Sequence, residues 1–179
     1  MPEMLEKPET TGEDQANHSA EEPRIGVYVC DCGGNISDTV HCDQVANVLA
    51  KLPNVVVSRR YQFICSDPGQ KLITDDIKEK GVNRVIVGAC SIFLHEQTFR
   101  RTVQRAGLNP YLYYHIGLRE QDSWVHHECS AEATDKAVRM MSAGVAKARL
   151  MQPLEPVHLD AVKHVLVIGG GVAGLRSAL

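Results

Sequence analysis

From residue 24 onward, short apolar runs alternate with segments in which apolar residues recur at helical spacing. The apolar runs predict four strands, at residues 25–30, 54–60, 83–90 and 111–117. The periodic segments predict helices at residues 40–52, 67–81, 96–107 and 134–150. Strands that alternate with helices are typical of βαβ units. We therefore predict an α/β fold with a small, open, mainly parallel sheet and flanking helices.

Individual residues predict where the helices begin, where they end and which face is buried. Asp67 is the expected N-cap ahead of Pro68, and Gly81 and Gly107 are expected to end their helices. The residues expected to face inward are Val45, Val48, Leu49, Leu52, Phe99, Val103, Ala106, Val138, Met141, Val145 and Ala148.

The last part of the chain has a different pattern. Residues 152–161 contain two prolines and no helical period, which predicts a linker. The string VLVIGGGVAGL follows, and its Gly169, Gly171 and Gly174 match a dinucleotide-binding fingerprint. A Rossmann unit needs roughly 30 residues and an acidic residue about 20 positions further on. Only residues 175–179 follow Gly174, so we expect an incomplete unit that binds no flavin by itself.

These patterns divide the chain into four expected parts. Residues 1–23 form an acidic tail expected to be disordered, and residues 24–151 form a cysteine-bearing α/β domain. Residues 152–162 form the linker, and residues 163–179 form the truncated start of a Rossmann domain. The tail holds seven acids and one lysine, so the rest of the chain carries a net charge of +3 within a total of −3.

Composition excludes several classes of protein. Charged residues make up 23% of the chain, and neither a basic stripe nor interleaved aromatic residues indicate nucleic-acid binding. No apolar run approaches the roughly 18 residues of a membrane span, and the acidic start is unlike a secretory signal. Six cysteines without such a signal indicate metal ligands or buried thiols in the reducing cytoplasm.

Four cysteines fall where predicted strands end. Cys30 closes the first strand and Cys32 lies in the turn beyond it, while Cys65 and Cys90 close the second and third strand regions. The carboxyl ends of parallel strands share one edge, so these thiols are expected to lie together. Compact C-x2-C runs are absent, and the spacing leaves three interpretations open: an iron–sulfur cluster, a zinc ion, or separate structural or reactive thiols.

The other candidate residues have simpler interpretations. Cys42 is expected to be a small buried apolar residue in the first helix. Cys129, near His126 and His127, is expected in a solvated loop. A nucleophilic cysteine would need a catalytic histidine and an acid, and no such set is evident. The remaining polar candidates, expected to act as helix caps and in ion pairs, are His95, Glu96, Arg119 and Glu120.

Several long strings resemble one known family. YVCDCGGNISD, FICSDPGQ, NRVIVGACSIFLHEQTFRRTVQRAGLNPYLYYHIGLREQDSWVH, VAKARLMQPLEP and VLVIGGGVAGL are similar to the N-terminal domain and the start of the FAD domain of the A subunit of heterodisulfide reductase. The resemblance runs from about residue 24 to residue 179. It implies a flavin and iron–sulfur subunit of cytosolic electron-transfer complexes.

The resemblance also implies residue roles and partners. Cys30, Cys32, Cys65 and Cys90 match the cysteines associated with a 4Fe-4S cluster. The fingerprint glycines match those that approach the FAD pyrophosphate, with FAD expected only if a longer or second chain completes the Rossmann domain. The implied partners are other subunits of a heterodisulfide-reductase-like complex, an electron-input subunit of hydrogenase or formate dehydrogenase, and ferredoxin.

The chain departs from the family pattern at three positions. Ile92 and Gln97 stand where prolines are common, and Asp122 stands where many members have a cysteine before S-W-V-H. If that cysteine is a ligand in relatives, the four-cysteine set is in doubt.

The expected function is electron relay through the cluster in a flavin-based, electron-bifurcating complex, with no complete active site in this chain. The alternative is a metal-free or zinc-containing docking domain without a redox role.

Overall fold

The computed structural model of the chain describes residues 22–157, 159 and 163–179, so nearly all of the expected acidic tail lies outside the described residues. The strands are β1 (Ile25–Cys30), β2 (Val55–Tyr61), β3 (Arg84–Ala89) and β4 (Tyr113–Gly117). The helices are α1 (Cys42–Leu49), α2 (Asp67–Lys80), α3 (Ile92–Arg105), α4 (Ser130–Ala148) and α5 (Val172–Ala178). Three short helical turns are η1 (Cys32–Gly34), η2 (Pro110–Leu112) and η3 (Arg119–Ser123).

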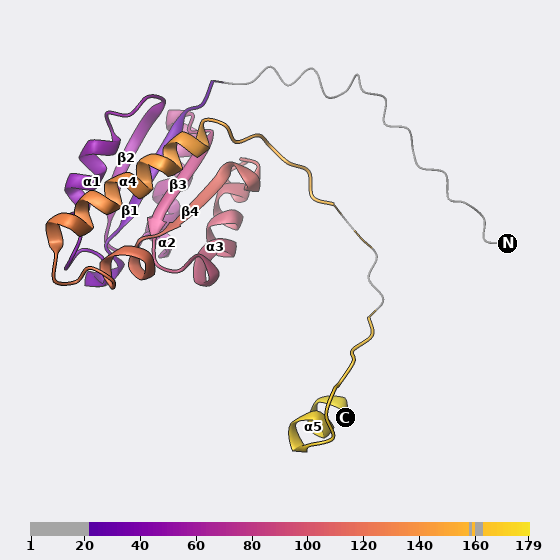
Figure 1. Ribbon diagram of the computed structural model, residues 1–179. Helices are drawn as coiled ribbons and strands as arrows, with labels where there is room; N and C mark the ends of the chain where they lie inside the picture. The colour runs from indigo at the N-terminus through magenta and orange to yellow at the C-terminus, as the bar shows by residue number, and fades with distance from the viewer. Residues whose placement is uncertain (1–21, 158, 160–162) are drawn as a thin grey trace.

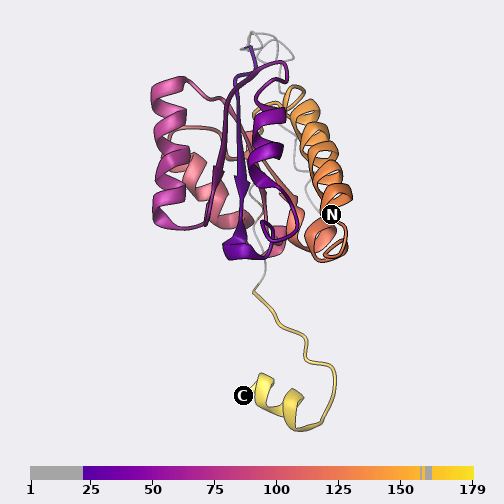
Figure 2. The ribbon, with the colours of Figure 1, turned by 90° about the vertical axis from the view of Figure 1, so that its left-hand side faces the viewer.

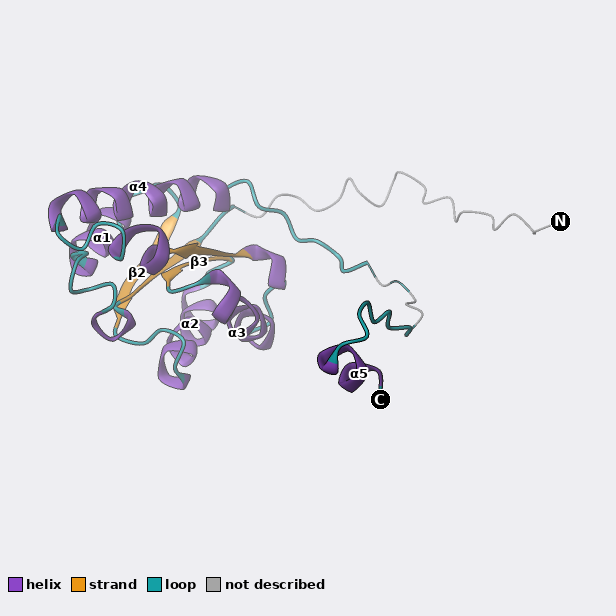
Figure 3. Ribbon diagram, turned by 60° about the horizontal axis from the view of Figure 1, so that its bottom comes forward, coloured by secondary structure: helices purple, strands orange, loops and turns teal. Residues whose placement is uncertain are grey.

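The four strands form one open sheet in the order β2-β1-β3-β4, and every pair is parallel. Helices α1 and α4 pack on one face, and α2 and α3 pack on the other (Figures 1 and 2). The predicted α/β class and the predicted parallel sheet are therefore confirmed. Figure 3 shows the same three layers from another side, with α4 and α1 above the sheet and α2 and α3 below it.

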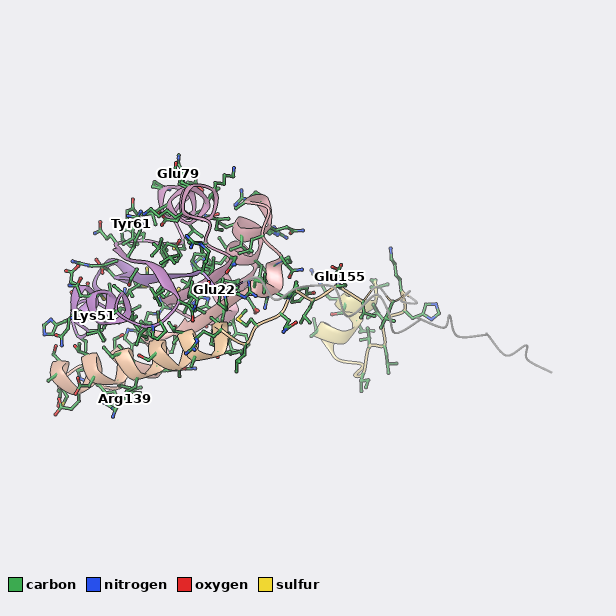
Figure 4. All side chains as sticks on the ribbon, turned by 90° about the horizontal axis from the view of Figure 1, so that it is seen from above. Glu22, Lys51, Tyr61, Glu79, Arg139 and Glu155 are labelled. Carbon is green, nitrogen blue, oxygen red and sulfur yellow. The ribbon has the colours of Figure 1, made fainter. Side chains whose placement is uncertain are left out.

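Each face of the sheet has its own apolar core, because successive side chains of a strand point to opposite faces. Ile25, Val27 and Val29 of β1 pack toward α1 and α4, whereas Tyr28 and Cys30 pack toward α2 and α3. In Figure 4, Glu79 of α2 and Arg139 of α4 mark the outer sides of the two helical layers. Both faces of β1 are buried, which explains its nearly continuous apolar sequence.

Helix α4 approaches β3 closely at Gly88. A Cβ atom at Gly88 would lie 2.5 Å from the Met141 sulfur and 2.8 Å from Leu118 Cδ1. The missing side chain therefore lets Met141, which is fully buried, fill the space over the centre of the sheet. The predicted inner stripe of this helix is confirmed for Met141, Val145 and Ala148.

Several predicted boundaries were wrong. Ser66, rather than Asp67, is the N-cap of α2, and its hydroxyl accepts a hydrogen bond from the Gly69 amide at 3.4 Å. Helix α3 begins at Ile92, four residues earlier than predicted. The prediction missed this first turn because Phe93 and Leu94 are exposed there, so its apolar residues do not follow the inward-facing helical period. Helix α4 likewise begins at Ser130 rather than residue 134.

The C-terminal segment carries little secondary structure among its described residues. Residues 163–170 form no strand, and α5 begins directly after Gly171 with no buried residue. Val165 and Ile168 are 87% and 89% exposed, because no strand within the described part of the chain pairs with this apolar run. Among the described residues, no helix combines the length and the apolar character needed to cross a bilayer.

Candidate metal site at the carboxyl edge of the sheet

The parallel register brings the four predicted cysteines to one edge of the sheet. Cys30 is the last residue of β1, and Cys90 directly follows β3 at Ala89. Cys32 lies in η1, immediately beyond β1. Cys65 was expected to close the second strand, but it lies four residues after β2 ends at Tyr61, in the turn that leads into α2. The site is therefore built from three loops that leave adjacent strands.

The loop after β1 turns back over the sheet edge through three successive residues with positive φ. Cys32, Gly33 and Gly34 have φ values of 53°, 61° and 104°. A non-glycine residue in this region is uncommon, so the left-handed conformation of Cys32 needs support from its surroundings. Hydrogen bonds from the Asp31 amide to the Tyr61 carbonyl (3.0 Å) and from the Gly33 amide to the Gln62 carbonyl (3.4 Å) provide it.

The Cys30 sulfur accepts two backbone hydrogen bonds. The Cys32 amide lies 3.3 Å and the Ile64 amide 3.4 Å from Cys30 Sγ. One amide comes from η1 and the other from the loop before Cys65, so both loops point N–H groups at the same sulfur. Such bonds stabilise negative charge on a thiolate or on a ligating sulfur.

Arg119 brings positive charge to the same group of thiols. Its Nη1 donates to Cys32 Sγ at 3.5 Å, and its Nε and Nη2 lie 2.9 Å and 2.7 Å from Glu120 Oε1. The guanidinium also stacks over the Trp124 ring, with 4.8 Å from Cζ to the ring centroid. The expected ion pair of Arg119 and Glu120 is confirmed, whereas the contact with Cys32 was not predicted.

A buried hydrogen-bonded pair holds the backbone of Cys90. His115 Nε2 lies 3.0 Å from the Cys90 carbonyl oxygen, and its Nδ1 lies 2.7 Å from the Tyr113 hydroxyl. Because a carbonyl only accepts, His115 carries its proton on Nε2, and Tyr113 donates to Nδ1. Burial lowers the pKa of His115 to about 4, so the ring is neutral at pH 7.

The four thiols perturb one another electrostatically. Each pair among them interacts in a way that raises a thiol pKa, in keeping with their position on loops that leave adjacent strands. Burial is the largest cause, raising the pKa of Cys30 to about 11 and that of Cys90 to about 12, and it also raises the pKa of Cys65. A nucleophilic cysteine needs a lowered pKa, so these shifts do not favour the interpretation as a thiol enzyme.

The other candidate residues are placed differently, although Cys42 Sγ lies 3.9 Å from the Cys30 carbonyl oxygen. Cys42 begins α1 and is buried in the core beside α4, as predicted. Cys129 is exposed at the start of α4, also as predicted. The fingerprint glycines lie around the start of α5, where Gly169 and Gly171 are exposed and Gly174 is half-buried. Among the described residues, no group of three or more His, Cys, Asp or Glu side chains has the spacing of a single-ion site.

Asp122, the departure from the family pattern, is completely buried in η3. Neither of its carboxyl oxygens has a hydrogen-bond partner among the described residues. Burial raises the pKa of Asp122, while the charges of Lys136, His126 and Arg139 act in the opposite direction. The sequence identified this position as unusual, but no sequence pattern indicated that it is buried.

Comparison with known proteins gives strong matches to one group, although no family model matches the chain. The chain is 55% identical over 167 residues to the A subunit of H(2):CoB-CoM heterodisulfide,ferredoxin reductase from Methanothermobacter thermautotrophicus, covering 93% of this chain and 25% of that protein. It is 53% identical over 159 residues to the second iron-sulfur A subunit of CoB--CoM heterodisulfide reductase from Methanopyrus kandleri, covering 89% and 24%.

A third relative is less similar and is matched over a comparable share of this chain. The A subunit of H(2)/formate:CoB-CoM heterodisulfide,ferredoxin reductase from Methanococcus maripaludis is 42% identical over 158 residues, which is 88% of this chain and 24% of that protein. The chain thus spans about a quarter of the length of the curated relatives it matches. Over nearly its whole length, the chain is homologous to one quarter of the A subunit of heterodisulfide reductase.

Proposed function

We propose that residues 24–151 form an electron-relay domain that binds one 4Fe-4S cluster through Cys30, Cys32, Cys65 and Cys90. When bound, the cluster supplies reversible one-electron transfer. The protein residues hold it, limit its contact with water and set the charge around it. The main support is the position of the four cysteines on three loops that leave adjacent strands, two of which donate backbone amides to Cys30 Sγ.

The chemistry of the donor set fits such a cluster. Thiolate sulfur is the ligand that iron–sulfur clusters use, and hydrogen bonds to sulfur stabilise the negative charge that a cluster carries. Backbone amides from two loops already point at Cys30 Sγ, and Arg119 donates to Cys32 Sγ. Because burial keeps the free thiols protonated at pH 7, binding of the cluster must release protons.

The relatives' names indicate the wider setting of this proposal. One is named as an iron-sulfur protein, and others as reductases of a heterodisulfide and ferredoxin, with H(2) or formate in their names. We propose that this chain works in a comparable multi-protein complex. We propose that Gly169, Gly171 and Gly174 contribute the pyrophosphate turn of an FAD site.

Metal analysis of protein purified without oxygen tests the proposal. We expect about four irons and about four acid-labile sulfides per chain, as in a 4Fe-4S cluster, and an EPR signal after reduction. Fewer than about two irons per chain would contradict the electron-relay function. One zinc per chain without visible absorption would instead support a structural metal site.

A further inference from the structure

We propose that Arg119 and Glu120 set the reduction potential of the cluster, with Arg119 raising the potential and Glu120 limiting that increase. This inference rests on the cluster proposed above, and it assigns both residues a positioning and electrostatic role without making either a ligand. The inference is based on three contacts of the Arg119 guanidinium, with Cys32 Sγ, the Glu120 carboxylate and the Trp124 ring.

These contacts fix the charge of Arg119 against a ligand sulfur. Nη1 lies 3.5 Å from Cys32 Sγ, while Nε and Nη2 are both held by Glu120 Oε1. The guanidinium carbon Cζ lies over the Trp124 ring. The Arg119 side chain is only 18% exposed, so solvent screens its charge less than that of a surface arginine.

Arg60, another arginine at this edge, is placed differently. Its guanidinium is bound by Asp31 at 2.8 Å and also by Asp43, so two carboxylates offset its single charge. Arg119 has one carboxylate partner and a direct contact with sulfur, and it also favours the charged form of Cys90. Arg119 is therefore the better placed of the two to influence electrons added to the cluster.

The direction of the effect follows from Coulomb's law. Reduction adds one negative charge to the cluster, and a nearby positive charge stabilises the reduced form more than the oxidised form. A hydrogen bond to the sulfur acts in the same direction. Removing Arg119 should therefore lower the reduction potential, whereas removing the charge of Glu120 should raise it.

Redox titration of the cluster-loaded protein, followed by EPR, tests this inference. We expect Arg119→Gln to lower the ratio of reduced to oxidised cluster roughly tenfold at the wild-type midpoint, which corresponds to about 59 mV for a one-electron couple. Glu120→Gln should move the midpoint the opposite way. The matched control is Arg101→Gln, at an exposed position in α3, which should leave the midpoint potential unchanged.

The variants separate a charge effect from a merely structural one. Arg119→Lys keeps the charge and loses the planar fork, so its midpoint should fall between those of wild type and Arg119→Gln. If Arg119→Gln loses its cluster, the sign of the Glu120→Gln shift decides the question. Wild-type potential in a loaded Arg119→Gln protein, or no upward shift in Glu120→Gln, would overturn the inference. A wild-type protein without a cluster would instead contradict the proposed function.

Discussion

Two buried side chains near the site show how single residues depend on their surroundings. Asp122 has no hydrogen-bond partner among the described residues, whereas His115 is bonded on both ring nitrogens. A buried carboxyl without a partner bears the full desolvation cost when it ionises. Both groups therefore make the stability of the protein depend on pH, but in opposite directions.

Replacing Asp122 should stabilise the protein at neutral pH. Burial raises the pKa of Asp122 in the folded state, so its contribution to stability is present in acid and is lost as pH rises through the folded-state pKa. Asp122→Asn cannot ionise and should gain about 1 kcal/mol in the free energy of unfolding at pH 7. Urea denaturation at pH 7 and pH 4 measures this gain.

The gain of Asp122→Asn should shrink at pH 4, because the wild-type carboxyl is then protonated to a much greater extent in both states. Asp135→Asn, at an exposed position on α4, is the control and should change stability little at either pH. Equal or lower stability of Asp122→Asn at pH 7 would show that the buried carboxylate has partners that offset its desolvation.

His115 should make the metal-free protein more stable as pH rises from about 4 to about 6.5. Burial lowers the pKa of His115 to about 4, whereas an unfolded histidine titrates near 6.5. Between these two pKa values, the histidine is protonated mainly in the unfolded state. The difference between the two pKa values contributes about 3 kcal/mol to the free energy of unfolding at pH 7, relative to strongly acidic pH. The rise should be smaller in His115→Gln, as measured by urea denaturation at several pH values. An identical pH dependence in the two proteins would contradict this account.

At the scale of elements, the loops that leave β1, β2 and β3 decide the geometry of the site. Ile64, in the loop after β2, donates its amide to Cys30 Sγ and sits directly before Cys65. The N-terminus of α2 packs on this loop at Gly69, where a Cβ atom would lie 2.5 Å from the Ile64 carbonyl oxygen and 2.6 Å from the Ile64 Cα. Both are backbone atoms, which cannot move without moving the loop.

Gly69→Ala should therefore displace the loop that carries Cys65. We expect a loss of about 1–3 kcal/mol in the free energy of unfolding and a lower iron content after reconstitution. Gly170→Ala is the matched control, because a Cβ atom there would meet nothing within 4 Å. Urea denaturation and iron analysis of the two variants measure these effects. Wild-type iron content in Gly69→Ala would show that the loop tolerates the shift.

The elements also show which features the sequence could predict. The strands were predictable because β1 and β3 are buried on both faces and read as apolar runs. Once a parallel sheet is predicted, its strand ends share one edge, and this was enough to predict that Cys30, Cys32, Cys65 and Cys90 lie together. The start of α3 was not predictable from periodicity, because Phe93 and Leu94 in its first turn face solvent.

The contact between Arg119 and Cys32 could not be predicted for a different reason. The two residues are 87 positions apart, and the short turn η3 that carries Arg119 has no apolar period. Their contact depends on the strand order that places β4 beside β3 and β3 beside β1. Such a contact follows from the register of the whole sheet, and the local sequence does not indicate it.

At the scale of the whole molecule, one sheet edge gathers the four cysteines proposed as ligands and Arg119. Cys30 and Cys90 come from the two central strands, and Cys65 and Arg119 come from segments that follow the two edge strands. The α/β core beneath is closed on both faces by helices, so it forms a rigid support for these loops (Figure 2). The relatives retain this unit within chains about four times as long.

The most direct test of the central claim is the iron content and EPR spectrum of single Cys→Ser variants reconstituted without oxygen. Changes at Cys30, Cys32, Cys65 or Cys90 should each abolish the cluster or alter its EPR spectrum. Changes at Cys42, which is buried, and at Cys129, which is exposed, should leave both measurements as in wild type. An unaltered cluster in any of the first four variants would contradict the claim that these four sulfurs hold it.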